Sequence, residues 1–249
     1  MPKLKVLLLT ACLLVAPFCY STGTTERHLL EQCISYEDLR TAIRYGQSWV
    51  DYPGYADRKA WEERVAPEMK EIIIRNGEKA LTHIWKPDLA SDYLAFKRTG
   101  EIRTGRANHR ALQALTLAEL VEGKGRFMDA IIDGTWFLCE TSWIHSAHLG
   151  FQKDRSGLPD RNEPTIELVV ADIGAQIAWT YYFLKDEFDK VSPLINQRIV
   201  EEGTKNLITP YFARDDYWWM GFGGQQVNNW NPWINYNVLQ ALMLVETDT

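Results

Sequence analysis

Three stretches of the sequence combine polar side chains with aromatic rings in a way that suits sugar binding. They are residues 140–148 (ETSWIHSAH), 214–222 (RDDYWWMGF) and 228–237 (NNWNPWINYN). Aromatic rings stack on sugar rings, while carboxylates, guanidinium groups and amides bind hydroxyl or acid groups. Singly, such residues are often core residues or helix caps. Together they would be costly to bury without partners, so the three stretches predict a wet, concave sugar site.

The residues predicted to contact sugar have aromatic, amide, carboxylate or guanidinium side chains. They are Glu140, Trp143, Arg214, Asp216, Tyr217, Trp218, Trp219, Trp230, Asn231, Trp233 and Tyr236. Two histidines, His145 and His148, could face the same cleft. Their i,i+3 spacing comes without the Glu-x-x-His or cysteine set of a zinc site, so we predict no metal and no other cofactor.

Apolar residues recur at helical spacing throughout the chain, and no stretch shows sustained strand-like alternation. This pattern predicts helices over residues 27–46, 58–75, 108–122, 126–143, 164–185, 193–208 and 233–246. Gly123 is expected to end one helix, and Ser192 with Pro193 to begin another. Helix pairs joined by irregular loops favour an all-α fold, an incomplete (α/α) toroid built from helical hairpins. Without a repeat or linker, residues 22–249 are predicted to form one domain.

The N-terminal residues 1–21 have the pattern of a signal peptide. Lys3 and Lys5 precede an apolar run over residues 6–18, and Ser21 ends a suitable cleavage site. A minor alternative is a lipoprotein anchored at Cys12. We therefore expect a secreted or periplasmic protein. No later stretch reaches the ~20 continuous apolar residues of a membrane span.

The net charge of the chain narrows the classes of molecule that it could bind. Removal of residues 1–21 leaves 25 basic and 33 acidic residues, a net charge of −8, which argues against nucleic acid. An acidic glycan would need a local basic or amide-lined patch, to which Arg103 or Arg214 could contribute. Cys33 and Cys139 could pair in an oxidising compartment, but the apolar run around Cys139 favours a buried free thiol.

The chain resembles the heparinase II/III family of polysaccharide lyases. The resemblance lies in residues 139–143 (CETSW), 158–160 (LPD), 178–182 (AWTYY), 214–222 (RDDYWWMGF) and 228–235 (NNWNPWIN), and it is strongest from Gly125 onward. It implies an N-terminal incomplete α/α toroid followed by downstream β-sandwich domains. It also implies eliminative cleavage of uronic-acid-containing, acidic polysaccharides.

In such an elimination a donor neutralises the uronate carboxylate, a base removes the C5 proton, and an acid protonates the departing oxygen. The resemblance implies that Asn229 neutralises the uronate carboxylate, with Asn228 as its neighbour. Trp230 stands where some related motifs have a histidine, so His145 or a later residue is expected to substitute as base. The family's tyrosine is expected beyond Thr249. The toroid is thus expected to be truncated at its C-terminal end and catalytically incomplete alone.

Two other functions fit the same residues. An α/α-barrel glycoside hydrolase would use Asp216 with Glu140 or Asp160 as acid and base on opposite sides of the scissile bond. The neighbouring Asp215 and Asp216 would not serve as that pair, because adjacent side chains rarely flank one bond at the ~5–9.5 Å separation required. A non-catalytic glycan-binding fragment would stack sugar on tryptophan without transferring a proton.

Overall fold

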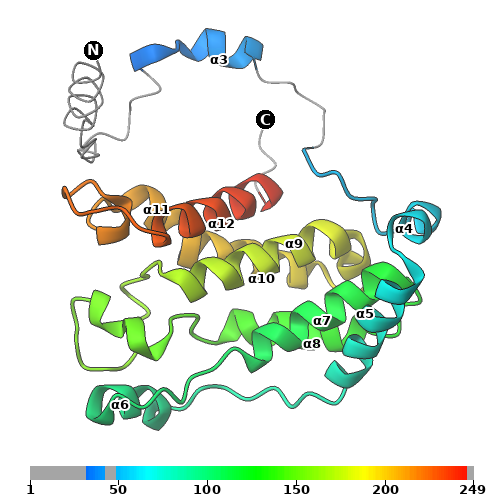
Figure 1. The fold of residues 1–249 in the computed structure, drawn as a ribbon, viewed down its shortest axis with the longest axis horizontal. Coiled ribbons are helices and arrows are strands. Elements are labelled where there is room, and N and C mark those ends of the chain that lie inside the picture. Colours follow the sequence, from blue (N-terminus) through cyan, green and yellow to red (C-terminus); the bar gives the residue numbers. More distant parts are fainter. Residues whose placement is uncertain (1–31, 43–48, 246–249) are drawn as a thin grey trace, which may run out of the picture.

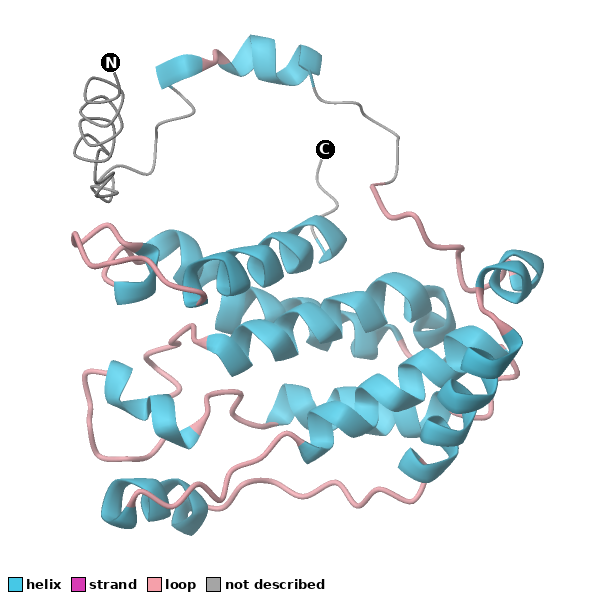
Figure 2. Cartoon of the chain, viewed as in Figure 1, coloured by secondary structure: helices cyan, strands magenta, loops and turns pink. Residues whose placement is uncertain are grey.

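The computed structural model describes residues 32–42 and 49–245, and every regular element in these two ranges is helical (Figure 2). The predicted all-α fold is therefore confirmed. The predicted signal peptide over residues 1–21 and the alternative anchor at Cys12 lie outside the described residues.

Among the described helices, the longest connection is the one that precedes α9. The helices are α3 (Tyr36–Ala42), α4 (Arg58–Arg64), α5 (Pro67–Ala80), α6 (Ala90–Thr99), α7 (Ala107–Glu122), α8 (Met128–Glu140), α9 (Leu168–Val191), α10 (Pro193–Gly203), α11 (Thr209–Ala213) and α12 (Trp230–Val245). Three short helical segments are η1 (Ser146–Phe151), η2 (Thr204–Ile208) and η3 (Trp218–Met220).

Helix ends explain where these bounds agree with the sequence prediction and where they differ. Gly123 ends α7 at a positive φ of 65°, and the Ser192 side chain accepts from the Leu194 amide at the start of α10, both as predicted. The helix predicted over 58–75 is two helices, because Pro67 lies in the first turn of α5. Helix α6 was not predicted from the apolar pattern.

Five of the larger described helices pack in two rows, and α5 packs along α7. Helix α9 contacts α7 on one side and α12 on the other, and Figure 1 shows these three lying side by side. Helix α8 packs against α7 and α10, and α10 packs against α9. The sequential hairpins α7–α8 and α9–α10 therefore each contribute one helix to the inner row, α7–α9–α12, and one to the outer row.

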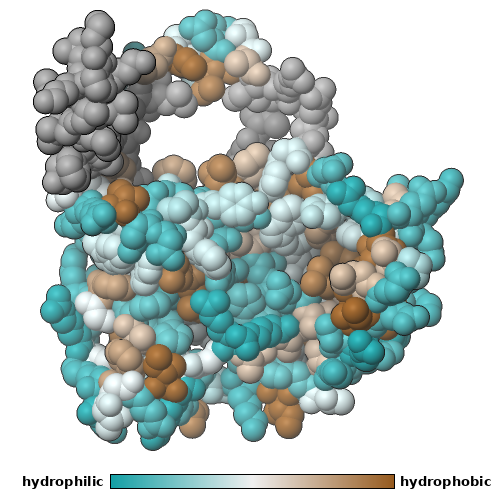
Figure 3. Space-filling view, in the orientation of Figure 1, coloured by the Kyte–Doolittle hydropathy of each residue, from teal (hydrophilic) through white to brown (hydrophobic). Residues whose placement is uncertain are grey.

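The core between the rows is apolar, and the surface is mixed. Leu115, Ile177 and Ile199, from α7, α9 and α10, are almost completely buried. Cys139 is also buried and free, as predicted, and burial raises the pKa of its thiol to about 12. Hydrophilic residues cover much of the face shown in Figure 3. None of the described helices has the length and apolar character that a membrane span requires.

Candidate functional site

A groove of about 830 Å³ runs along the inner row of helices. Its walls come from α7, α9 and α12, and the segment from Trp49 to Trp61 contributes the remaining lining residues. No residue of α8 or α10 lines it, so it lies on the face of the inner row that the outer row leaves uncovered. We call it the inner groove.

A charged network lies in the inner groove. Arg106 Nη1 is 2.9 Å from Asp172 Oδ2, and Asp172 Oδ1 accepts hydrogen bonds from Trp233 Nε1 at 2.6 Å and from Asn237 Nδ2 at 3.2 Å. Burial raises the pKa of Asp172, while the Trp233 hydrogen bond and the Arg106 charge lower it. The network ties together the residue preceding α7, the first part of α9 and the first part of α12.

Next to this network, the groove wall carries two buried polar atoms that have no partner among the described residues. They are Nδ1 of His109 and Oε1 of Gln176. The Gln176 amide nitrogen is used, because it donates to the His109 carbonyl at 3.0 Å. Both atoms are buried, so they make the groove wall polar but have no exposed surface for a ligand to contact.

Aromatic rings line the inner groove on the α12 side and on the α9 side. Trp233 and Tyr236 of α12 are half or more exposed. On the other side, Trp179 of α9 packs with Trp49 at a centroid distance of 5.5 Å and with Tyr52 at 6.3 Å. Exposed rings beside hydrogen-bonding groups are the combination that sugar binding needs.

A second group of rings, the aromatic–histidine cluster, joins all three stretches singled out in the sequence. It consists of His145, His148, Phe151, Trp218 and Trp230. The Trp230 ring lies 4.9 Å from His148 and 5.1 Å from Trp218, and His145 lies 5.3 Å from His148. Trp230 begins α12, one turn before Trp233 in the groove, so the cluster and the groove share this end of α12.

No protein-family model matches the chain, and no curated protein matches it.

The asparagines of 228–235 have different tasks. The Asn228 side chain accepts from the Trp230 amide at 2.9 Å and caps α12. Asn231 donates to the Trp219 carbonyl at 3.0 Å, and Asn235 accepts from the Tyr211 hydroxyl at 2.9 Å. These three amides hold the fold. The side chain of Asn229 is exposed, and only its backbone carbonyl has a partner that the structure identifies, the Trp233 amide.

Three aromatic residues predicted to contact sugar are core residues. Trp143, Tyr217 and Trp219 are each about 5% exposed or less. The Trp143 indole donates to Leu138, and the Trp219 indole donates to the Ile166 carbonyl. Because no ring face of these residues is open, they are part of the packed core and offer no surface on which a sugar could stack.

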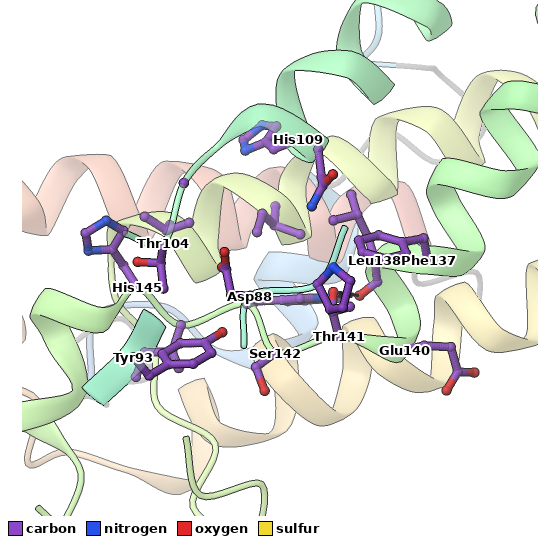
Figure 4. A pocket seen from close by; sticks show the side chains of 17 residues that line it. Asp88, Tyr93, Thr104, His109, Phe137, Leu138, Glu140, Thr141, Ser142 and His145 are labelled. Atoms are coloured by element: carbon purple, nitrogen blue, oxygen red, sulfur yellow. Dashed lines mark hydrogen bonds between the residues drawn. The ribbon is translucent and has the colours of Figure 1, made fainter. Parts of the chain in front are cut away.

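The predicted charged residues lie in different parts of the structure, except for one pair. Arg214 forms a two-bond ion pair with Asp216, both bonds 2.8 Å, and Glu140 pairs with Arg198 at 2.9 Å. Glu140 lines a separate pocket of about 250 Å³, where Figure 4 shows it pointing away from the other labelled side chains. Asp216 and Asp160 each line a further pocket. The three carboxylates considered for a hydrolase thus border three different cavities.

His145 lines the same small pocket as Asp88, Thr104 and His109 (Figure 4). Its Nδ1 accepts from the Ala147 amide at 3.3 Å. Burial lowers its pKa, and the His148 and Arg106 charges lower it further, against the opposite effect of Glu167. Arg106 thus lies close enough to influence both His145 and Asp172.

The sequence interpretation missed several residues of the groove, although a signal for them was present. Arg106, Arg110 and Gln113 have the i,i+4,i+7 spacing of one helix face, as do Asp172, Gln176 and Trp179 on α9. The second set is polar within a helix that is otherwise strongly apolar. The motif-based assignment passed over both faces because they lie outside the aromatic stretches.

His109 should make the stability of the protein depend on pH. Its pKa is lowered from 6.5 to about 4, first by burial and then by the Arg106 and Arg110 charges. Between these values the unfolded chain binds more protons, so the contribution is complete above pH 6.5 and is lost as the pH falls towards 4. We expect a loss of roughly 3 kcal/mol in unfolding free energy from this residue. Urea unfolding at several pH values across this range should show a smaller loss of unfolding free energy for His109→Gln than for the wild type. An equal loss in the two proteins would contradict the role of His109.

Proposed function

We propose that this chain is the α/α-toroid part of a secreted or periplasmic polysaccharide lyase, similar to the heparinase II/III family, that cleaves acidic, uronate-containing glycans by β-elimination. The observation that carries the proposal is the inner groove, in which exposed aromatic rings lie beside arginine side chains. The two rows of helical hairpins are the arrangement from which a toroid is built.

The charges in the groove favour an acidic ligand. Arg110 is exposed and lines the groove, and Arg106 is partly exposed although it is paired with Asp172. A guanidinium group binds a carboxylate or sulfate strongly because its donors match the anion's oxygens. The groove also contains Asp51, which pairs with Arg64 at 3.1 Å. With both aspartates paired, Arg110 is the cation that an acidic ligand would meet.

Asn229 is suited to the uronate carboxylate. It directly precedes α12, one turn before Trp233, and Trp233 lines the groove and donates to Asp172. An amide donor at that position would hydrogen-bond the carboxylate as negative charge develops on it, which makes the C5 proton more acidic. Trp233 and Tyr236 would hold the neighbouring sugar by stacking.

The other two candidate functions have less support. A hydrolase needs two carboxylates about one substrate bond, and the three candidates line separate cavities. A non-catalytic module would explain the rings and arginines, but it gives no role to the histidines beside Trp230.

The product identifies the reaction. If the full-length protein, with the downstream part that the resemblance implies, is incubated with heparan sulfate, hyaluronan and alginate, we expect at least one polymer to be shortened with formation of a C4–C5 double bond at the new non-reducing uronate. This full-length protein is the wild type of every activity measurement below. That double bond absorbs ultraviolet light and appears in the mass of the product as the absence of one added water. Shortening with addition of water would establish a hydrolase, and binding without shortening would establish a binding module.

A further inference from the structure

The strongest unassigned arrangement of titratable groups is a buried carboxylate in contact with a histidine. Glu167 is the N-cap of α9 and has no exposed surface. Its Oε1 accepts from the amides of Val170 at 3.0 Å and His145 at 3.3 Å. Its Oε2 accepts from the Val169 amide at 2.9 Å and contacts Nδ1 of His148.

The contacts of Glu167 determine where His148 carries its proton. The three backbone groups around the carboxylate are all N–H donors, so the carboxylate is in its accepting, ionised form. Nδ1 of His148 is then the donor to Oε2. In the neutral ring the other nitrogen, Nε2, has a free lone pair and can accept a proton. A carboxylate that fixes a histidine tautomer in this way is a common arrangement behind a general base.

His148 is also well placed for substrate. Its side chain keeps 21% of its surface exposed, although its Nδ1 faces a fully buried group. The ring lies edge-on to Trp230, with centroids 4.9 Å apart, and Trp230 directly follows Asn229. The proposed base thus contacts the residue that directly follows the proposed carboxylate donor.

His145 is less suited to the role. Its Nδ1 already accepts the Ala147 amide, so its neutral ring carries the proton on Nε2 and has no lone pair to offer there. His148 has the opposite tautomer. The two neighbouring histidines therefore present a donor and an acceptor.

We infer that His148 is the general base of the proposed elimination and that Glu167 is its positioning residue; the inference rests on the proposed function. Nε2 of His148 takes the C5 proton, and the C5–H electron pair forms the C4–C5 double bond. The C4–O bond breaks, and its electron pair leaves on the departing glycosidic oxygen. That oxygen takes one proton from solvent, and the imidazolium returns one proton to solvent. Atoms and charge balance without a further reactant.

The test follows proton removal as well as cleavage. With the polymer among heparan sulfate, hyaluronan and alginate that the wild type cleaves fastest, we expect His148→Ala to lower unsaturated product formation by roughly 10²- to 10⁴-fold. The affinity for the same polymer should be retained, and added imidazole should restore part of the rate. His148→Ala that cleaves at the wild-type rate, or that imidazole does not rescue while folding is retained, would overturn the role of base and leave the proposed function standing.

A second measurement addresses the tautomer without using activity. Nitrogen-15 NMR of the wild type should show the His148 proton on Nδ1 and none on Nε2, and Glu167→Gln should weaken this preference. A proton on Nε2 of the wild type would overturn the pairing. If Glu167→Gln does not fold because the cap of α9 is lost, the wild-type spectrum still decides. A wild type that cleaves none of the three polymers would overturn the proposed function and the base role together, whatever the tautomer.

Discussion

In the full-length protein, Asn229→Ala is expected to lower the rate of uronate cleavage by roughly 10²-fold, the loss typical of a donor that stabilises a developing anion. The melting temperature should stay near the wild-type value. The reason is that the Asn229 side chain is exposed, while its backbone carbonyl, which the substitution retains, accepts the Trp233 amide. The rate is measured from ultraviolet-absorbing product under saturating polymer, beside a thermal unfolding curve.

Asn231→Ala is the matched control for this prediction. Asn231 is two residues away, but its amide bonds the Trp219 and Met220 carbonyls and accepts from Asn235. Its removal leaves buried groups unpaired and should lower the melting temperature. If Asn229→Ala cleaves as fast as the wild type, the assignment of Asn229 to the uronate carboxylate is wrong.

Local sequence determined most of the helices but not the site. The period of apolar residues predicted the all-α fold, and Gly123 and Ser192 marked helix ends because their capping geometry is local. Helix α6 was missed because only Tyr93 and Ala95 of its ten residues are buried, so its apolar stripe is short. Composition and pattern have little to detect in such a helix.

The groove could not be predicted because it depends on which helices become neighbours. Arg106 and Asp172 are 66 residues apart, and neither lies in a motif. The burial of individual tryptophans also could not be predicted from the sequence. Trp218 and Trp219 are adjacent in sequence, yet Trp219 is fully buried and Trp218 stays partly open in the aromatic–histidine cluster. The short η3 turn gives the two rings opposite directions, and only tertiary packing decides which one faces the core.

Arg110→Glu is expected to weaken binding of an acidic glycan by at least about 10-fold. The arginine is exposed on α7 and lines the inner groove, so the substitution removes a charge-assisted hydrogen bond and places a negative charge opposite the ligand. A hydrogen bond to a charged group contributes about 1.5–3 kcal/mol, and 1.4 kcal/mol corresponds to a factor of ten in affinity. The effect should shrink as salt is added, because exposed charges are screened.

The central claim, that the inner groove binds an acidic polysaccharide, is tested most directly by titrating wild type and Arg110→Glu with oligosaccharides of heparan sulfate, hyaluronan and alginate. Arg75→Glu is the control, since it makes the same charge change at an exposed position of α5 outside the groove. We expect the wild type and Arg75→Glu to bind one of these glycans with similar affinity, and Arg110→Glu to bind it at least about 10-fold more weakly. Equal affinity for Arg110→Glu and Arg75→Glu, or no binding by the wild type, would contradict the claim.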